Sequence, residues 1–209
     1  MRAWGKVNIV TDDGETREAQ APIIISASRS TDIPAFYADW LIERIRRGYV
    51  AWKNPFNGKT IYVSFAEARM IVFWSKNPRP LLAHMDCLKE MGIHCYIQYT
   101  LNDYADEGLE PGVPSVHSRV ETFKLLVDRL GPGAVVWRYD PLILSDTLTI
   151  YRLLEKVARI GDQLKGYTEK LVYSYADIGA YRKVKANLSK HESGMREFSK
   201  EEKHRWAKE

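Results

Sequence analysis

The 209-residue sequence contains only two cysteines, Cys87 and Cys95. Two cysteines are too few for the disulfide framework of a small secreted domain. Cys87 lies in a helical pattern and Cys95 in a strand pattern, so we expect reduced thiols in the core. No apolar run approaches the ~18 residues of a membrane-spanning helix, and the N-terminal stretch MRAWGKVNIV lacks the apolar segment of a signal peptide. We therefore expect a cytoplasmic protein that does not contact a membrane.

Several catalytic motifs are also absent. The sequence has no HxH or HExxH motif, and its five histidines do not follow predicted strands: His84, His94, His117, His191 and His204. Zinc-dependent hydrolysis is therefore disfavoured, and no metal ligands are expected. No GxGxxG follows a strand and no GxxxxGK[ST] occurs, which disfavours a Rossmann dinucleotide site and a P-loop. The absence of GxSxG argues against a hydrolase nucleophile elbow.

The formal net charge of +4 is concentrated near the C-terminus. Residues 181–209 contain nine Lys or Arg and five Asp or Glu, which accounts for the whole surplus. Residues 1–180 are therefore neutral, and a uniformly basic nucleic-acid-binding face is not indicated. The basic tail 181–209 has two interpretations, a contact for a polyanion or a solvated helix, and we favour the solvated helix.

Two β-hairpins are predicted by turn residues between strand-like runs. Asp12-Asp13-Gly14-Glu15 separates two short runs near the N-terminus, so residues 1–21 are expected to form an N-terminal hairpin extension. Asn57-Gly58 lies between the runs 49–53 and 60–65, which predicts a second hairpin inserted into the core fold.

The rest of the sequence alternates between short apolar runs and amphipathic runs. The expected strands are Ile23–Ile25, which we expect to be buried on both faces, Met70–Trp74, His94–Tyr99, Ala134–Trp137 and Leu171–Tyr173. The expected helices are Phe36–Arg47, Arg79–Met91, Val116–Leu130, Asp146–Ile160 and Ala180–Leu188. Such alternation predicts an α/β fold, with a parallel (β/α) repeat of about five strand–helix units.

Five units are fewer than the eight of a closed TIM barrel. We therefore expect one domain, 1–209, that forms an incomplete TIM-type barrel, with an open barrel or a doubly wound sheet as alternatives. Ser199-Lys200-Glu201-Glu202 is a capping-box pattern that opens a last helix close to Glu209. This position predicts that the sequence is truncated at its C-terminus. The open sheet edges of such a fold favour self-association.

Each expected strand is followed by polar residues, and in a parallel sheet these positions meet at one rim. The expected catalytic residues are Arg29, Asp32, Lys76, Arg138 and Asp140. The expected substrate-binding residues are Ser26, Ser28, Ser75, Asn77, Gln98, Tyr99, Thr100, Asn102, Tyr139, Ser174 and Tyr175. A structural alternative is that Thr31 or Asp32 caps a helix, that Arg29 is a solvated loop charge, and that Arg138 and Asp140 pair with neighbours to hold the rim together.

Five motifs occur in this order along the chain: SASRSTDIPAFY, VFWSKNP, QYTLNDY, LEPGVP and WRYDP. Together they resemble the DUF1848 proteins of bacteria and archaea, from about Pro22 to the end of the sequence. The resemblance implies a relative of the radical S-adenosylmethionine (SAM) enzymes, with a [4Fe-4S] cluster and SAM expected in a full-length family member. The family's cysteine cluster lies near the C-terminus, whereas this sequence has no cysteine after Cys95. We therefore expect that this chain alone binds no such cofactor. The sequence is either truncated before the cluster, which we favour because the last helix is unfinished, or a degenerate homologue.

The resemblance favours an enzyme fragment that binds SAM or an anionic substrate at the rim. In this hypothesis Arg29, Lys76 and Arg138 hold a carboxylate, and Asp32 and Asp140 accept hydrogen bonds from ribose or an amino group. Two alternatives stay open. One is a cluster-free barrel that binds or hydrolyses a phosphorylated small molecule, and the other is a non-enzymatic nucleic-acid-binding protein that uses the basic tail.

Overall fold

The computed structural model describes residues 4–27, 31–54, 57–179 and 194–208. The chain has an α/β fold with mixed and parallel sheets, which confirms the predicted class. It divides into two compact units, Met1–Gln98 and Tyr99–Glu209. Each unit is built differently, and each is described by itself below.

The first unit contains both predicted hairpins. β1 (Gly5–Val10) pairs antiparallel with β2 (Thr16–Ala21), and β4 (Tyr49–Lys53) pairs antiparallel with β5 (Thr60–Ser64). The two hairpins join through a short parallel contact between β2 and β5, so the mixed sheet has the order β1-β2-β5-β4. Gly14 has a φ of 81°, which residues with a side chain rarely adopt, and this explains the Asp-Gly turn signal.

A cluster around Asp12 fastens the first hairpin to the neighbouring elements. The Asp12 carboxylate accepts hydrogen bonds from Arg44 (2.9 Å) and Arg47 (3.2 Å), and its backbone N–H donates to the Tyr49 hydroxyl (2.7 Å). The Arg44 guanidinium also lies 4.4 Å from the centre of the Tyr49 ring. The hydrogen bond from Arg44 is the main reason that the pKa of Asp12 is lowered to about 2.

Parallel strands form the other part of the first unit, in the order β3-β6-β7. β3 (Ile24–Ala27) pairs in parallel with β6 (Met70–Ser75), and β7 (His94–Thr100) follows α3. The predicted burial of the first strand on both faces was wrong, because Ile23 is 58% and Ile24 is 51% exposed. Only alternate residues of β3 pack inward, so β3 has one covered face and one open face.

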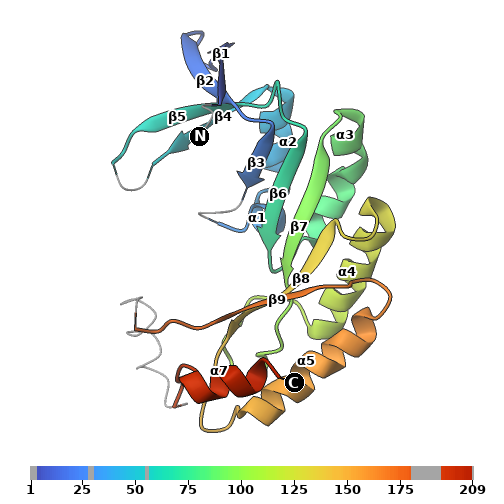
Figure 1. Cartoon of the computed structure of the whole chain (residues 1–209). Helices are drawn as coiled ribbons and strands as arrows, with labels where there is room; N and C mark the ends of the chain where they lie inside the picture. The colour runs from blue at the N-terminus through green and yellow to red at the C-terminus, as the bar shows by residue number, and fades with distance from the viewer. Residues whose placement is uncertain (1–3, 28–30, 55–56, 180–193, 209) are drawn as a thin grey trace. The chain divides into compact units, whose positions relative to one another are not determined.

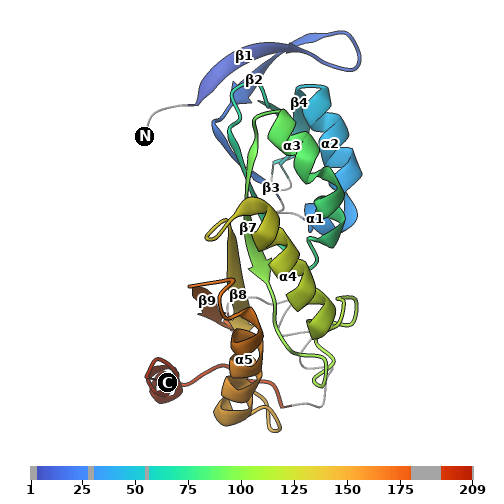
Figure 2. The same ribbon diagram turned by 90° about the vertical axis from the view of Figure 1, so that its right-hand side faces the viewer.

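Short helices cover one face of these strands. The predicted helix Phe36–Arg47 is divided into α1 (Ile33–Phe36) and α2 (Ala38–Arg46). The predicted helix Arg79–Met91 is divided into a 3₁₀ segment, η1 (Arg79–His84), and α3 (Met85–Glu90). Figure 2 shows α2 and α3 side by side in front of the strands, whereas the β4–β5 hairpin extends away from β3 in Figure 1.

The second unit is built on two parallel strands, β8 (Val135–Leu142) and β9 (Leu171–Tyr175), beside the end of β7. Helix α4 (Val116–Leu130) has the predicted bounds, and α5 (Ile150–Leu164) starts four residues later than predicted, after the cap Thr149. Both helices lie together along β8 (Figure 2). β8 and β9 continue beyond their predicted ends, so residues expected in loops lie within strands.

The described part of the C-terminal tail packs against β9. Helix α7 (Lys200–Trp206) begins with the predicted capping box between Ser199 and Glu202. Phe198 and Trp206 are buried, and their rings contact those of Tyr175 and Tyr173 on β9. These four rings make α7 part of the second unit rather than a solvated appendage. The predicted helix at 180–188 lies outside the described residues.

Within the described part of the chain, no helix is long and apolar enough to cross a membrane.

The attachment of α7 should weaken in acid. Arg196 donates two hydrogen bonds to the Glu202 carboxylate (2.7 and 2.8 Å), and this contact is the main reason that the Glu202 pKa is lowered from 4.5 to about 2. A depressed carboxylate pKa stabilises the folded state above the unfolded pKa, and this stability is lost as the pH falls toward the folded pKa. We therefore expect the advantage in melting temperature of the wild type over Glu202→Gln to shrink between pH 4.5 and 2.

Arg196→Gln removes the same two hydrogen bonds and should reduce this pH dependence, while the Ser199 N–H, 2.8 Å from Glu202, continues to lower the Glu202 pKa. Thermal melts followed by circular dichroism at each pH measure the effect. A constant difference between wild type and Glu202→Gln across this range would contradict the assignment.

Candidate functional site

Three predicted polar residues meet near the carboxyl ends of β8 and β9. Arg138 donates a hydrogen bond to the Asp140 carboxylate at 2.7 Å, and the Ser174 hydroxyl donates to the other oxygen of the same carboxylate. The Arg138 side chain is 13% exposed and the Asp140 side chain is 27% exposed. The two residues therefore form a partly buried ion pair that still reaches the surface. Because it is partly buried, solvent and salt screen its charges less than those of a fully exposed pair.

The buried side chain of Asn102 fixes the backbone beneath this pair. Its carbonyl oxygen accepts from the Asp140 N–H at 2.9 Å, and its NH₂ group donates to the Asp140 carbonyl at 3.1 Å. The amide of Asn102 thus pairs with β8 as the backbone of a neighbouring strand would. Because Asn102 is fully buried, losing either bond would leave an unsatisfied polar group in the interior.

Two residues that the sequence analysis missed hold Asn102 in place. Arg119 on α4 donates to the backbone carbonyl of Asn102 at 2.7 Å. The side-chain NH₂ group of Asn102 also donates to Glu110 at 3.0 Å. Arg119 and Glu110 lie 3.6 Å apart, with side chains only 3% and 6% exposed. The sequence contained one signal that Arg119 would be buried. Arg119 shares the apolar face of α4 with Phe123 and Leu126, so a cation at this position indicates a buried partner.

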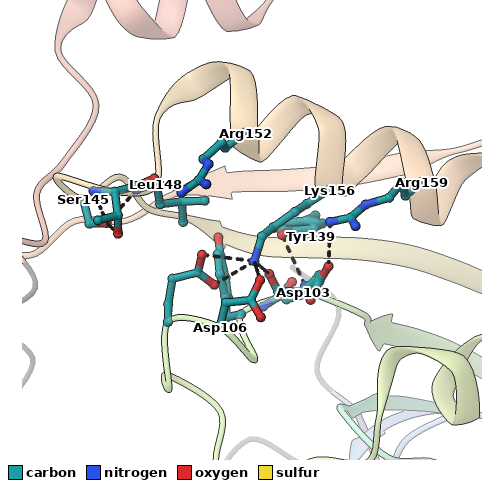
Figure 3. A network of polar contacts seen from close by, with 12 residues as sticks. Asp103, Asp106, Tyr139, Ser145, Leu148, Arg152, Lys156 and Arg159 are labelled. Atoms are coloured by element: carbon teal, nitrogen blue, oxygen red, sulfur yellow. Dashed lines mark hydrogen bonds and ion pairs between the residues drawn. The ribbon is translucent and has the colours of Figure 1, made fainter.

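A second buried cation anchors the loop after β7. Lys156 on α5 donates to the Asp103 carbonyl (3.0 Å), to Asp106 (3.2 Å) and to Glu107 (2.9 Å). Figure 3 shows its amino group pointing into these acidic side chains. Lys156 also stands at an apolar position of its helix, three residues after Leu153, which the sequence analysis did not use. Interaction with the carboxylates outweighs burial and raises the pKa of Lys156.

Tyr139 belongs to the core of the second unit. It is fully buried, its ring packs edge-on against Tyr104 at 5.5 Å, and its hydroxyl accepts from the Asp103 N–H at 3.2 Å. Burial raises its pKa well above the usual tyrosine value. Tyr99 is also buried and stacks on Phe123 at 5.7 Å. Both predicted binding residues therefore lie where packing dominates.

The predicted residues of the first unit surround the ends of β3 and β6. Asp32 caps α1 by accepting from the Ala35 N–H at 3.0 Å, and its other oxygen accepts from the Lys76 N–H at 2.8 Å. Ser75 is buried and accepts from the Asn77 N–H at 3.0 Å. Asp32 thus ties the start of a helix to the end of a neighbouring strand, as the structural alternative expected.

The remaining predicted residues are more dispersed. Ser26 on β3 lines a cavity of the first unit, and Gln98 and Thr100 are half-buried residues of β7. Tyr175 donates to the Lys203 carbonyl at 3.2 Å beneath α7. Ser28 and Arg29 lie outside the described residues. Within the second unit the structure thus brings together Asn102, Arg138, Asp140 and Ser174, and within the first unit Asp32, Ser75, Lys76 and Asn77.

The cysteines do not fit an iron–sulfur cluster. Such a cluster needs several thiolates close together, but Cys87 lies on α3 and Cys95 on β7. Cys95 is buried, and burial raises its pKa to about 12, which keeps it protonated. Among the described residues, no group of three or more His, Cys, Asp or Glu side chains is placed to hold a metal ion.

Comparison with known proteins gives one match. Residues 24–209 match the family model DUF1848, a domain of unknown function. No curated protein and no solved structure matches this chain. The match begins at β3 and covers the parallel strands, the Asn102 contacts and the Arg138–Asp140 pair.

Removing the Lys156 charge should destabilise the second unit. Lys156→Met keeps the apolar stem but leaves Glu107, whose side chain is only 11% exposed, without its cation. Breaking a buried pair in this way costs about 3 kcal/mol of unfolding free energy. Arg159→Met on the same helix is the matched control, because Arg159 is 66% exposed and lies 3.5 Å from Asp103. Its loss should cost less than about 1 kcal/mol.

Urea denaturation of both variants measures this difference. Equal midpoints for Lys156→Met and Arg159→Met would show that the acidic side chains around Lys156 do not depend on its charge.

Proposed function

The chain belongs to the DUF1848 family, and from its Arg138–Asp140 pair we propose that it is part of a radical-SAM-like enzyme that binds the amino-acid group of SAM. In this proposal the parallel strands are those of an incomplete TIM-type barrel in a cytoplasmic protein, and the ligand lies at their carboxyl ends. The observation that carries the proposal is a cation and an anion side by side in β8, four and two residues before its last residue, Leu142.

An Arg–Asp pair is complementary to the two charges of a free amino acid. The guanidinium of Arg138 suits a carboxylate, because its planar N–H groups can donate two parallel bonds. The carboxylate of Asp140 suits the ammonium group, and Ser174 holds one of its oxygens in position. The partial burial of both side chains strengthens these contacts relative to a fully exposed pair.

The iron–sulfur cluster of a radical SAM enzyme would supply the electron that cleaves SAM. The cysteines of this chain do not fit such a cluster. The residues around the Arg138–Asp140 pair would bind and orient the ligand. Arg138 and Asp140 would hold the ligand, while Asn102 and Arg119 would keep the backbone of Asp140 fixed.

Two other functions have less support. A phosphorylated ligand at Arg138 would be repelled by the Asp140 carboxylate, which lies 2.7 Å from the guanidinium, and unlike an amino acid it has no ammonium group to offset this repulsion. Nucleic-acid binding through the tail 181–209 would use its basic residues. In the described part of that tail, Arg196 is paired with Glu202 at 2.7 Å, and the Lys203 amino group lies 5.1 Å from the centre of the Tyr175 ring.

Binding of SAM, L-methionine and 4-(methylsulfanyl)butanoate, which is methionine without its amino group, tests the proposal by isothermal titration calorimetry. Asp140→Asn should weaken SAM and methionine at least tenfold, since it removes the partner of the ammonium group. The same variant should not weaken 4-(methylsulfanyl)butanoate, because this ligand has no ammonium group and the variant removes a repelling charge. Arg138→Gln should weaken all three ligands, because each contains a carboxylate.

Arg152→Gln is the control variant, because Arg152 lies on α5 and donates to the Thr147 carbonyl rather than to the pair. It should bind all three ligands as the wild type does. Melting curves of each variant establish that the second unit is folded. No binding of SAM or methionine at millimolar concentration, or equal affinities in wild type and Asp140→Asn, would refute the proposal.

A further inference from the structure

The first unit contains a cavity of about 630 Å³ that the proposed function does not use. It lies between β3, the α1–α2 segment and the β4–β5 hairpin, with further residues from β2 and the end of β5. This volume is in the range of sites that hold small organic molecules. The described residues that line the cavity all belong to the first unit, whereas Arg138 and Asp140 belong to the second.

The described residues that line the cavity are mostly apolar, and none of them is charged. Among the described residues, the fifteen that line it include no Asp, Glu, Lys, Arg or His. A charged ligand would lose part of its hydration here without gaining a counter-ion from these fifteen side chains, which disfavours its binding. A neutral ligand avoids this cost.

Three large aromatic side chains from separate elements line the cavity. Tyr37 precedes α2, Trp40 lies on α2 and Trp52 lies on β4, and they are 49%, 45% and 42% exposed. Exposed rings that face one hollow offer stacking surfaces to a flat aromatic ligand, and each such contact adds to the gain from burial. The polar lining groups are few, and those of Gln20, Ser26 and Thr31 can give a neutral ligand its orientation.

We propose that this cavity is a binding site for a neutral, flat aromatic molecule. The uncharged side chains of the described lining favour a neutral ligand, and the rings of Tyr37, Trp40 and Trp52 favour a flat one. The ligand class differs from the zwitterion assigned to Arg138 and Asp140, so each site can be tested without the other.

A pair of probes with nearly the same shape tests the charge preference. 2-Naphthamide is neutral and 2-naphthoate is anionic, and calorimetric titration of the full chain gives the affinity of each. The neutral amide should bind at least tenfold more tightly than the carboxylate. Equal affinities, or no binding of the amide up to its solubility limit, would overturn the proposal. This comparison needs only the wild-type protein.

Two variants at one position locate the binding site. Val63 lies on β5 and lines the cavity, whereas Ala66 is exposed after β5 and does not line it. Val63→Phe fills part of the cavity and should weaken 2-naphthamide at least tenfold, while Ala66→Phe should leave its affinity within twofold. Val63→Lys adds a cation and should strengthen 2-naphthoate at least tenfold, and Ala66→Lys should not. Naphthamide binding that Val63→Phe leaves unchanged would refute this location.

Sedimentation in the same buffer tests a second copy of the chain as the occupant. The edge of β3 beside the cavity is a site where another strand could pair. The proposal expects 2-naphthamide to bind whether or not the chain self-associates. A dimer that shows no heat of binding with 2-naphthamide would assign the cavity to a protein interface instead. Arg138→Gln should leave naphthamide binding unchanged, so failure of the Arg138–Asp140 proposal is distinguishable from failure of this one.

Discussion

The pairing of the Asn102 amide with the backbone of Asp140 is the constraint on which the second unit depends. β7 ends at Thr100, whereas β8 continues to Leu142. Beyond the end of β7, the two hydrogen bonds of the Asn102 amide replace those that a neighbouring strand would make with Asp140. Because Asn102 is fully buried and has no solvent to replace these bonds, the register of β8 at Asp140 has little freedom. The position of the Arg138–Asp140 pair follows from this register. Arg119 and Lys156 act on the same region from two helices, by holding the carbonyls of Asn102 and Asp103.

The sequence predicted elements whose signals are local. The Asp-Gly and Asn-Gly turns predicted both hairpins, and the Ser199 capping box predicted the start of α7. Helix α4 was predicted with its observed bounds, because a Ser115 cap precedes an amphipathic run that Gly131 ends. In these cases a few neighbouring residues determine the backbone conformation. The incomplete TIM-type barrel depends on long-range pairing, and it stays a prediction.

Features that depend on distant partners could not be predicted from the sequence. Arg138 and Asp140 were interpreted as loop residues, because polar side chains after an apolar run usually mark a strand end. Pairing with β9 extends β8 through both residues, and their partners lie in β9 and in the loop after β7. Arg119 and Lys156 were overlooked for a related reason. Their cost of burial is offset by carboxylates and carbonyls far away in the sequence.

The ring cluster between β9 and α7 also bears on how this chain can be shortened. Tyr173 and Tyr175 lie on β9, while their partners Phe198 and Trp206 come from the last twelve residues. A deletion from Phe198 onward would therefore remove core side chains and expose two tyrosine rings on an edge of the second unit. The shortened protein would expose an apolar surface that favours aggregation. Poor solubility after this truncation would therefore reflect the loss of packing and not the loss of a bound ligand.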